Sequence, residues 1–166
     1  MLGKSLAATS VIVLALAAPA LAQTPTQISQ YNAWGAYSYQ SKSGKVCYVL
    51  SVPTSKKPSN VDHGDNFFLV SQKPGQNVSY EPQFMAGYDL KDKVIAKVDN
   101  GTPFTLFTSG RSAWLENAAQ EPQLISAMKA GGELEIDAES ARGTKTNYTF
   151  SLKGISAALD AISKCK

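Results

Sequence analysis

The chain has 166 residues, with 16 basic and 13 acidic side chains and a formal net charge of +3 at neutral pH. A charge this close to balance does not indicate nucleic acid or an anionic membrane surface as a partner. One histidine cannot supply a usual zinc ligand set and no other ligand cluster is visible, so we expect no metal or cofactor.

Residues 1–22 have the features of a secretory signal peptide. Lys4 precedes an apolar run from Leu6 to Ala18, and Ala20-Leu21-Ala22 fits the small-x-small pattern before a signal-peptidase cut. The apolar run is shorter than the roughly 20 residues that cross a bilayer, which argues against a membrane anchor. We therefore predict export, with cleavage before Gln23 and no transmembrane segment in the mature chain.

The segment after the predicted cleavage site, residues 23–30, is polar and lacks periodicity, so we expect a disordered leader there. One domain is expected over residues 31–166, because the mature chain is long enough to bury a single core. Alternation of apolar and polar residues, many of them β-branched or aromatic, predicts strands over 34–39, 45–52 and 66–72. Residues 53–65 hold prolines and turn formers and are predicted to form a long loop.

The second half of the chain continues this pattern of short strands and turns. Residues 78–90 hold one interrupted strand or two short ones around Pro82, which belongs at an edge or bulge because proline donates no ladder hydrogen bond. Strands at 93–98 and 104–108 flank a strong turn signal and are predicted to form a hairpin. The alternation over 133–137 and 146–152 predicts further strands.

Two short helices are also predicted. The first begins at Pro122 and ends before Gly131-Gly132, and the second covers 155–162, where apolar residues recur at helical spacing after Gly154. About ten short strands separated by turns favour a sandwich over an α/β fold. We therefore predict a mainly β, single-domain, sandwich-like fold with two short α-helices, one of them C-terminal.

If the chain is exported, its two cysteines are expected to form a disulfide, because an oxidising compartment allows thiols to pair. Cys47 lies in the strand predicted over 45–52, and Cys165 continues the apolar stripe of the helix predicted over 155–162. Only one pairing exists, so we predict a Cys47–Cys165 disulfide that joins the last helix to an early strand. The alternative, a redox or metal-binding pair, is disfavoured because there is no C-x-x-C spacing and no histidine near either thiol.

Candidate catalytic residues are sparse. His63 lies between Asp62 and Asp65 and could bind a metal with them, but a lone histidine in a polar loop is more typical of a solvated side chain, which we expect here. The strand over 133–139 carries an acidic residue at every second position, so these carboxylates share one face. Paired carboxylates can act on glycosides, but this pattern is more typical of the solvated face of a strand. No G-x-S-x-G motif or dinucleotide fingerprint is present.

Several segments, in this order along the chain, resemble one protein family. They are Lys45-Val46-Cys47-Tyr48, Asn66 to Ser71, Gly87-Tyr88, Ala113-Trp114-Leu115, Ala127 to Gly131, and Ser140-x-Arg142-Gly143-Thr144 followed by Tyr148 to Cys165. Together they are similar to the invasion-associated locus B family of exported bacterial proteins, over about residues 31–165. The resemblance implies a compact, mostly β domain in the periplasm or at the outer surface, with no known catalytic activity. Some members aid entry into host cells, but many relatives come from free-living or plant-associated bacteria, so invasion is not carried over.

The resemblance thus implies a non-enzymatic envelope or surface-associated protein that binds host cells or envelope partners. Arg142-Gly143-Thr144 is the part of the motif most open to a role beyond packing. The structural alternative is that Arg142 bonds loop carbonyls or pairs with Glu139. One alternative function is a periplasmic structural module, or one that binds a peptide along an exposed sheet edge. Another is an envelope hydrolase that uses the acidic strand or the loop around His63.

Overall fold

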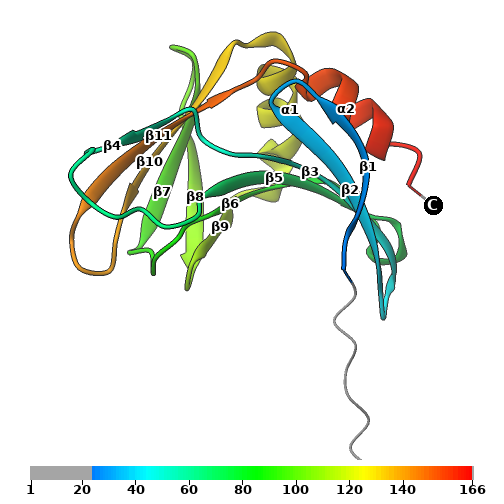
Figure 1. Ribbon diagram of the computed structural model, residues 1–166, viewed down its shortest axis with the longest axis horizontal. Helices are drawn as coiled ribbons and strands as arrows, with labels where there is room; N and C mark the ends of the chain where they lie inside the picture. The colour runs from blue at the N-terminus through cyan, green and yellow to red at the C-terminus, as the bar shows by residue number, and fades with distance from the viewer. Residues whose placement is uncertain (1–23, 166) are drawn as a thin grey trace, which may run out of the picture.

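The computed structural model describes residues 24–165, so the predicted signal peptide lies outside the described residues. These residues form a single antiparallel sheet of eleven strands in the order β1-β2-β3-β5-β6-β9-β8-β7-β10-β11-β4 (Figure 1). The strands are β1 (Thr26–Tyr31), β2 (Trp34–Ser41), β3 (Gly44–Ser51), β4 (Ser55–Lys57), β5 (Phe67–Lys73), β6 (Val78–Met85), β7 (Lys93–Val98), β8 (Phe104–Ser109), β9 (Ser112–Leu115), β10 (Glu133–Glu139) and β11 (Lys145–Ser151). The helices are α1 (Glu121–Ala130) and α2 (Ile155–Ile162), with short 3-10 turns η1 (Pro74–Gln76) and η2 (Ala118–Gln120).

The sheet bends so strongly that strands far apart in its order face one another across the core. Phe68 on β5 meets Phe150 on β11 with ring centroids 6.0 Å apart, and Phe84 on β6 meets Tyr148 on β11 at 5.4 Å. All four rings are fully buried. Burial of a large apolar side chain contributes roughly 1.5–3 kcal/mol, so this aromatic cluster is a main source of cohesion between the two halves. The predicted mainly β, sandwich-like fold is confirmed.

Both helices pack at the same end of the sheet (Figure 1). Helix α2 follows β11 directly and buries all of its predicted apolar stripe: Ile155, Ala158, Leu159 and Ile162. Gly154 precedes it with φ of 94°, and a Cβ there would lie 2.0 Å from the carbonyl oxygen of Tyr31. Only glycine fits this position, which explains why the strand pattern breaks there. Helix α1 begins at the predicted proline turn and buries Leu124, Ile125 and Met128. Within residues 24–165, neither helix nor any other is long and apolar enough to cross a membrane.

The hairpin predicted at 93–98 and 104–108 is confirmed as β7 and β8, with Lys93 opposite Phe107 and Ala96 opposite Phe104. The interrupted pattern around Pro82 is one strand, β6. Strand β9 pairs with β6 only from Gln83 onward, so Pro82 lies just outside that ladder. This position agrees with the exclusion of proline from a strand that is paired along both sides.

The expectation of a disordered leader over 23–30 is wrong for Thr26–Gln30, which belong to β1 and pair with β2. The strand was missed because most of its side chains are exposed and polar, and backbone hydrogen bonds hold it at the sheet edge. The loop predicted over 53–65 likewise contains a short strand, β4, which pairs with β11. Its polar sequence, Ser55-Lys56-Lys57, is typical of an edge strand that discourages pairing with another chain.

Candidate functional site

The structure contains the predicted disulfide between Cys47 on β3 and Cys165, just beyond α2. The Cα atoms are 6.0 Å apart, and both residues are buried, at 2% and 6% exposure. The bond closes a separation of 118 residues, for which the loss of chain entropy in the unfolded state is about 4.7 kcal/mol. The disulfide thus has a structural role, as a clamp between the last helix and the sheet.

The motif Arg142-Gly143-Thr144 forms the turn between β10 and β11. Ser140 holds this turn, since its amide donates to the Thr144 carbonyl at 2.9 Å and its hydroxyl accepts from the Thr144 amide at 3.1 Å. Gly143 has φ of 88°, a value that favours glycine. Glu139 pairs with Lys91 at 2.9 Å, so the Arg142–Glu139 pair weighed from the sequence is not formed. The exposed Arg142 is left at the tip of a well-ordered turn.

Arg142 lines a surface cavity of about 380 Å³, which we call the arginine cleft. Three segments meet there: the loop after β6, the turn between β8 and β9, and the turn between β10 and β11. The cleft is lined by Gly87, Tyr88, Asp89, Arg111, Ser140, Ala141 and Arg142. Of these, the sequence had singled out only the turn at Arg142 as a possible site. Arg111 is not among the candidates that the sequence indicates.

Behind the cleft lies a chain of hydrogen-bonded groups, which we call the polar network: the Pro58 carbonyl and the side chains of His63, Tyr148, Tyr88 and Thr146. The Nε2 atom of His63 donates to the Pro58 carbonyl at 2.8 Å, since a carbonyl only accepts. The Nδ1 atom of the same ring lies 2.9 Å from the hydroxyl of Tyr148. The Tyr148 hydroxyl donates to that of Tyr88 at 3.0 Å, and the Tyr88 hydroxyl lies 2.6 Å from that of Thr146. The network therefore connects the centre of the core to the wall of the cleft.

The prediction of a solvated His63 is wrong, because this side chain is only 7% exposed. Its loop folds back over β11, and the imidazole meets the Tyr148 ring edge-on with centroids 5.3 Å apart. Asn66 fixes the loop, since its buried amide donates to the carbonyls of His63 and Gly64 at 3.0 and 2.9 Å. Burial raises the pKa of Tyr148, with a further contribution from the hydrogen bond to Tyr88, so Tyr148 keeps its proton at physiological pH. His63 thus has a structural environment, without a metal ligand set.

The carboxylates of the acidic strand β10 lie on the outer face of the sheet, as predicted. Glu135 pairs with Lys97 at 3.3 Å, and Asp137 accepts from the amide of Asn147 at 2.8 Å. None of the residues from 24 to 165 form a cluster of three or more side chains suited to hold a metal ion. The acidic strand is therefore a solvated face with cross-strand partners, rather than a convergent pair of catalytic acids.

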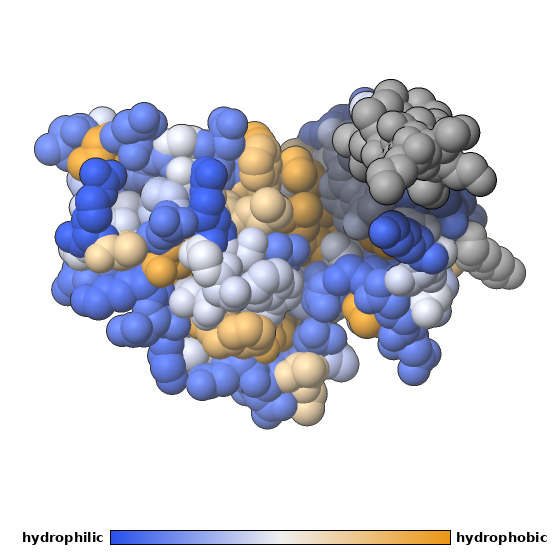
Figure 2. Space-filling model, turned by 90° about the horizontal axis from the view of Figure 1, so that it is seen from below, coloured by the Kyte–Doolittle hydropathy of each residue, from blue (hydrophilic) through white to orange (hydrophobic). Residues whose placement is uncertain are grey.

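On the outer face of the other strands, apolar side chains line up across the sheet. The strand register makes Leu50 a neighbour of Leu69, Leu69 of Gln83, Gln83 of Trp114, and Trp114 of Phe107. We call Leu50, Leu69, Trp114 and Phe107 the apolar row. Phe107 and Trp114 stack with centroids 5.7 Å apart, and Phe107 is 46% exposed. Seen from below, the molecule has apolar surface gathered across its middle, between hydrophilic flanks (Figure 2).

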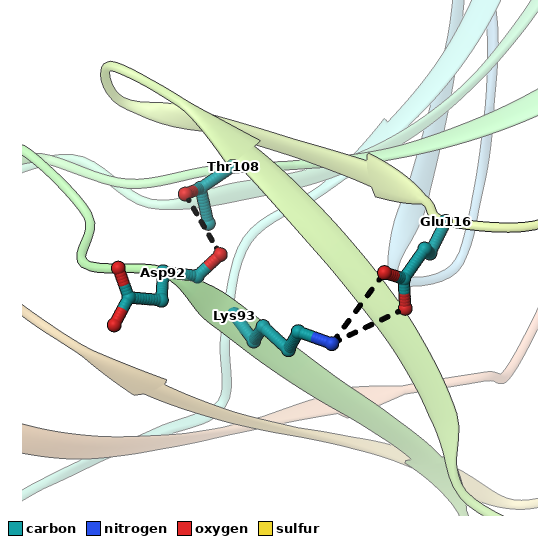
Figure 3. Close-up of polar contacts among 4 residues, drawn as sticks. All are labelled: Asp92, Lys93, Thr108 and Glu116. Carbon is teal, nitrogen blue, oxygen red and sulfur yellow. Dashed lines mark hydrogen bonds and ion pairs between the residues drawn. The ribbon is translucent and has the colours of Figure 1, made fainter.

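Charged residues lie at the borders of the apolar row. Lys93 is the cross-strand neighbour of Phe107, and its ammonium lies 3.4 and 3.5 Å from the two carboxylate oxygens of Glu116 (Figure 3). The hydroxyl of Thr108 donates to the Asp92 carbonyl at 3.1 Å, which ties β8 to the start of β7 (Figure 3). On the same face of β6, Glu81 pairs with Lys73. The row is thus an apolar strip with a polar rim.

The mostly β fold agrees with the family suggested by the sequence. A model of the Invasion associated locus B (IalB) protein family matches residues 34–163. The chain belongs to the IalB family. It is similar in structure to the crystal structure of invasion associated protein b from Bartonella henselae, with a TM-score of 0.57 and 17% identity over 82% of this chain and 96% of that one. An identity this low shows a common fold alone. No curated protein sequence matches the chain significantly.

The region matched by the IalB family model contains both candidate sites. It includes the four residues of the apolar row and both arginines of the cleft, and it ends before Cys165. Sequence reasoning missed the apolar row because each member lies in a strand that reads as largely apolar on both faces. The signal that could have found the cleft is that Arg111 and Arg142 each lie beside a glycine, in a short segment of small and polar residues that is typical of a turn.

Proposed function

We propose that this IalB family member is exported to the periplasm or cell surface and acts there by binding a protein partner, without catalysis. The apolar row is the observation that carries the proposal. Its side chains lie on the outer face of the sheet, where Phe107 and the neighbouring Met85 are 46% and 36% exposed. Leu69 is buried within the row and Leu50 and Trp114 are half-buried, so the row is exposed mainly at Phe107. Exposed apolar side chains beside a continuous apolar surface are typical of an interaction surface.

The composition of the strip favours a protein as its partner. Tyrosine, tryptophan, phenylalanine and methionine are enriched at the centres of protein interfaces, and charged residues are depleted there. Tyr37 stacks on Tyr48 at 5.3 Å beside the row, and Trp114 stacks on Phe107 within it. Gly35 lies beneath the ring of Tyr37, where any Cβ would come within 2.6 Å of ring atoms. The aromatic surface is therefore held in place by the sheet before any partner arrives.

The rim of the strip has the polarity of an interface rim. Lys93 pairs with Glu116 and Lys73 pairs with Glu81, so both signs of charge flank the row. Exposed pairs of this kind add little stability, but they favour some partners over others and influence the association rate. A neutral apolar centre with a mixed charged rim fits a folded protein surface.

Addition of a peptide to an edge of the sheet is less well supported. Of the two edge strands in the described part of the chain, β4 has three residues and carries Lys56 and Lys57, and β1 has an irregular register between Gln27 and Ser29. Short, charged and bulged edges resist the addition of another strand. The carboxylates of β10, with partners on the outer face, likewise give no support to a hydrolase.

The proposal is tested by placing a photo-crosslinking amino acid at Phe107 of the full chain in its native host. A matched control carries it at Ile28, which is 47% exposed against 46% for Phe107 and lies on β1, away from the row. We expect an adduct with a specific protein from Phe107 and not from Ile28. We also expect Trp114→Ser to weaken the affinity of the purified partner by about tenfold or more, because truncating a central aromatic anchor costs roughly 2 kcal/mol.

Equal crosslinking from both positions, or an unchanged affinity of the Trp114→Ser variant, would refute the role of the apolar row. An adduct between two copies of the chain would show that the apolar row mediates self-association and does not bind a different protein. Mass spectrometry of the protein from the envelope fraction tests export separately, since the predicted mature chain begins at Gln23.

A further inference from the structure

We propose that the arginine cleft binds a monoanionic carboxylate ligand that also carries hydroxyl groups, such as a uronic acid sugar. This site is separate from the apolar row and does not rest on the protein-binding function proposed above. The inference comes from four features of the cleft: its arginines, the rigidity of the turns that carry them, its balance of charge, and its size.

The placement of arginine is the first feature. The chain has 16 basic residues, of which only Arg111 and Arg142 are arginines, and both line the same cavity. They come from different hairpin turns and meet only because β8, β7 and β10 are neighbours in the sheet. A planar guanidinium binds a carboxylate through two parallel hydrogen bonds, which a lysine ammonium cannot do. Two arginines in one cleft therefore indicate that they bind an oxyanion, and not that they serve only to keep the protein soluble.

Backbone hydrogen bonds hold the three segments of the cleft together. The Ala86 amide donates to the Arg111 carbonyl at 2.8 Å, and the Leu90 amide donates to the Gly110 carbonyl at 2.9 Å. On the other side, the Ala141 amide donates to the Asp89 carbonyl at 2.8 Å. The loop after β6 is thus bonded to both arginine-bearing turns. A ligand meets a site whose backbone is already ordered, so binding requires little loss of chain entropy.

The loop after β6 is also fixed from behind. A Cβ on Gly87 would lie 2.2 Å from the carbonyl oxygen of His63, so the loop of the polar network and the loop of the cleft are in direct backbone contact. The hydroxyl of Tyr88 lies within the network, at 2.6 Å from that of Thr146, while the residue itself lines the cavity. The network thereby orients Tyr88 as part of the cleft wall.

The arginines retain hydrogen-bonding capacity for a ligand. Arg111 donates through Nε to the Ala86 carbonyl at 3.2 Å, which steadies its guanidinium group. Its terminal nitrogens, and the whole guanidinium of Arg142, take part in no other hydrogen bond or ion pair within residues 24–165. Such groups are available to the two oxygens of a carboxylate.

The balance of charge selects the class of anion. Arg111, Arg142 and one acidic residue, Asp89, line the cleft, and the adjacent Lys91 and Glu139 form an ion pair with one another. The cleft therefore has a net charge of about +1, which a monoanion neutralises and a phosphate dianion exceeds. Asp89 would accept hydrogen bonds from hydroxyl groups of the ligand, and Ser140 lines the cavity beside it. An acidic sugar supplies both the single carboxylate and the hydroxyls.

The size of the cleft fits this class. A volume of about 380 Å³ lies near the lower end of the range for small-molecule sites, roughly 300–1,000 Å³. The cleft thus accommodates one sugar ring and leaves the rest of a longer saccharide in solvent. The shared chemistry is the uronate group, which a free sugar and the terminal unit of an acidic polysaccharide both provide.

The test is an NMR titration of the mature protein with D-glucuronate, with D-glucose and inorganic phosphate as comparison ligands. We expect millimolar binding of glucuronate, with amide shifts confined to residues 86–92, 109–112 and 140–144. D-glucose should cause no such shifts, because it lacks the carboxylate, and phosphate should bind more weakly. Oligogalacturonate would bind more tightly than the single sugar if the natural source is a polysaccharide, and equally if it is a free sugar acid.

Variants distinguish binding through the paired hydrogen bonds of a guanidinium, the arginine fork, from attraction of the anion by positive charge alone. Arg142→Gln should weaken glucuronate binding by about tenfold, and Arg142→Lys should restore only part of the loss, because lysine keeps the charge without the fork. Lys145→Gln, an exposed cation after the same turn, is the matched control and should leave binding unchanged. Arg142 has no bond to lose on substitution, so a melting curve unchanged from that of the wild type is expected.

Three results would overturn the inference. They are the absence of shifts in the cleft with glucuronate, equal shifts with D-glucose, and tighter binding of phosphate than of glucuronate. Full affinity in Arg142→Gln would equally rule out this cleft as the site. None of these outcomes bears on crosslinking at Phe107, so the two proposals succeed or fail independently.

Discussion

The two ends of the sheet are stabilised by different interactions. At one end, α2 buries aliphatic side chains and the Cys47–Cys165 disulfide fixes it to β3. At the other end, where the turn between β10 and β11 lies, the turns are joined by backbone hydrogen bonds and by the polar network around His63. A close-packed apolar interface leaves no space for another molecule, whereas hydrogen-bonded turns present polar groups to solvent. The helix end therefore serves stability, and the turn end is the one suited to recognising a small polar ligand.

The largest expected effect comes from breaking the covalent clamp at the helix end. Cys165→Ser should lower the free energy of unfolding by about 4 kcal/mol, because the unfolded chain regains the freedom of a loop that spans 118 residues. Chemical denaturation of the oxidised protein measures this loss. The reduced wild-type protein is the control and should unfold at the midpoint of the variant. A variant as stable as the oxidised wild type would show that apolar packing alone holds the helix.

A smaller loss is expected from the packing that accompanies the clamp. Leu159 is fully buried between α2 and the sheet, so Leu159→Ala should cost about 3 kcal/mol through lost burial and the cavity that remains. The exposed Ala157→Ser change on the same helix is the matched control, with an expected effect near zero. Urea denaturation with the disulfide intact gives both values. A loss below that caused by Ala157→Ser would mean that the helix relaxes fully around the missing side chain.

The turn end should respond less to a single change and more to alkaline pH. Tyr148→Phe keeps the buried ring but removes the hydroxyl between His63 and Tyr88, with an expected loss of about 1.5 kcal/mol at neutral pH. Because the pKa of Tyr148 is raised above 10.0 in the folded protein, the wild type should lose stability as the pH rises above that value, where the unfolded chain releases the proton first.

This alkaline loss should be weaker in Tyr148→Phe. Urea midpoints between neutral pH and strongly alkaline pH measure the difference. Tyr48→Phe is the comparison, since burial also raises the pKa of Tyr48 and part of the effect belongs to that residue. Parallel pH profiles for the wild type and Tyr148→Phe would contradict a role for the buried hydroxyl in this pH dependence.

The same contrast explains what the sequence could predict. The helix end follows from periodicity, since Ile155, Leu159 and Ile162 recur at helical spacing and only one cysteine pair is possible. The turn end depends on contacts between distant segments, which no local pattern contains. His63 is buried because β11 places Tyr148 against it, and Arg111 lines the same cavity as Arg142 because of the strand order. The edge strands β1 and β4 escaped prediction for a related reason, since backbone pairing rather than apolar side chains defines them.

The position of Cys165 has a consequence for the biogenesis of the protein. All eleven strands precede this residue, so a ribosome or a translocation pore must release the whole sheet before the bridge can form. The bridge therefore forms only after the last strand of the sheet has emerged. Any molecule whose synthesis stops short of Cys165 carries Cys47 as an unpaired thiol, so a thiol-reactive reagent would distinguish immature from finished copies in the cell.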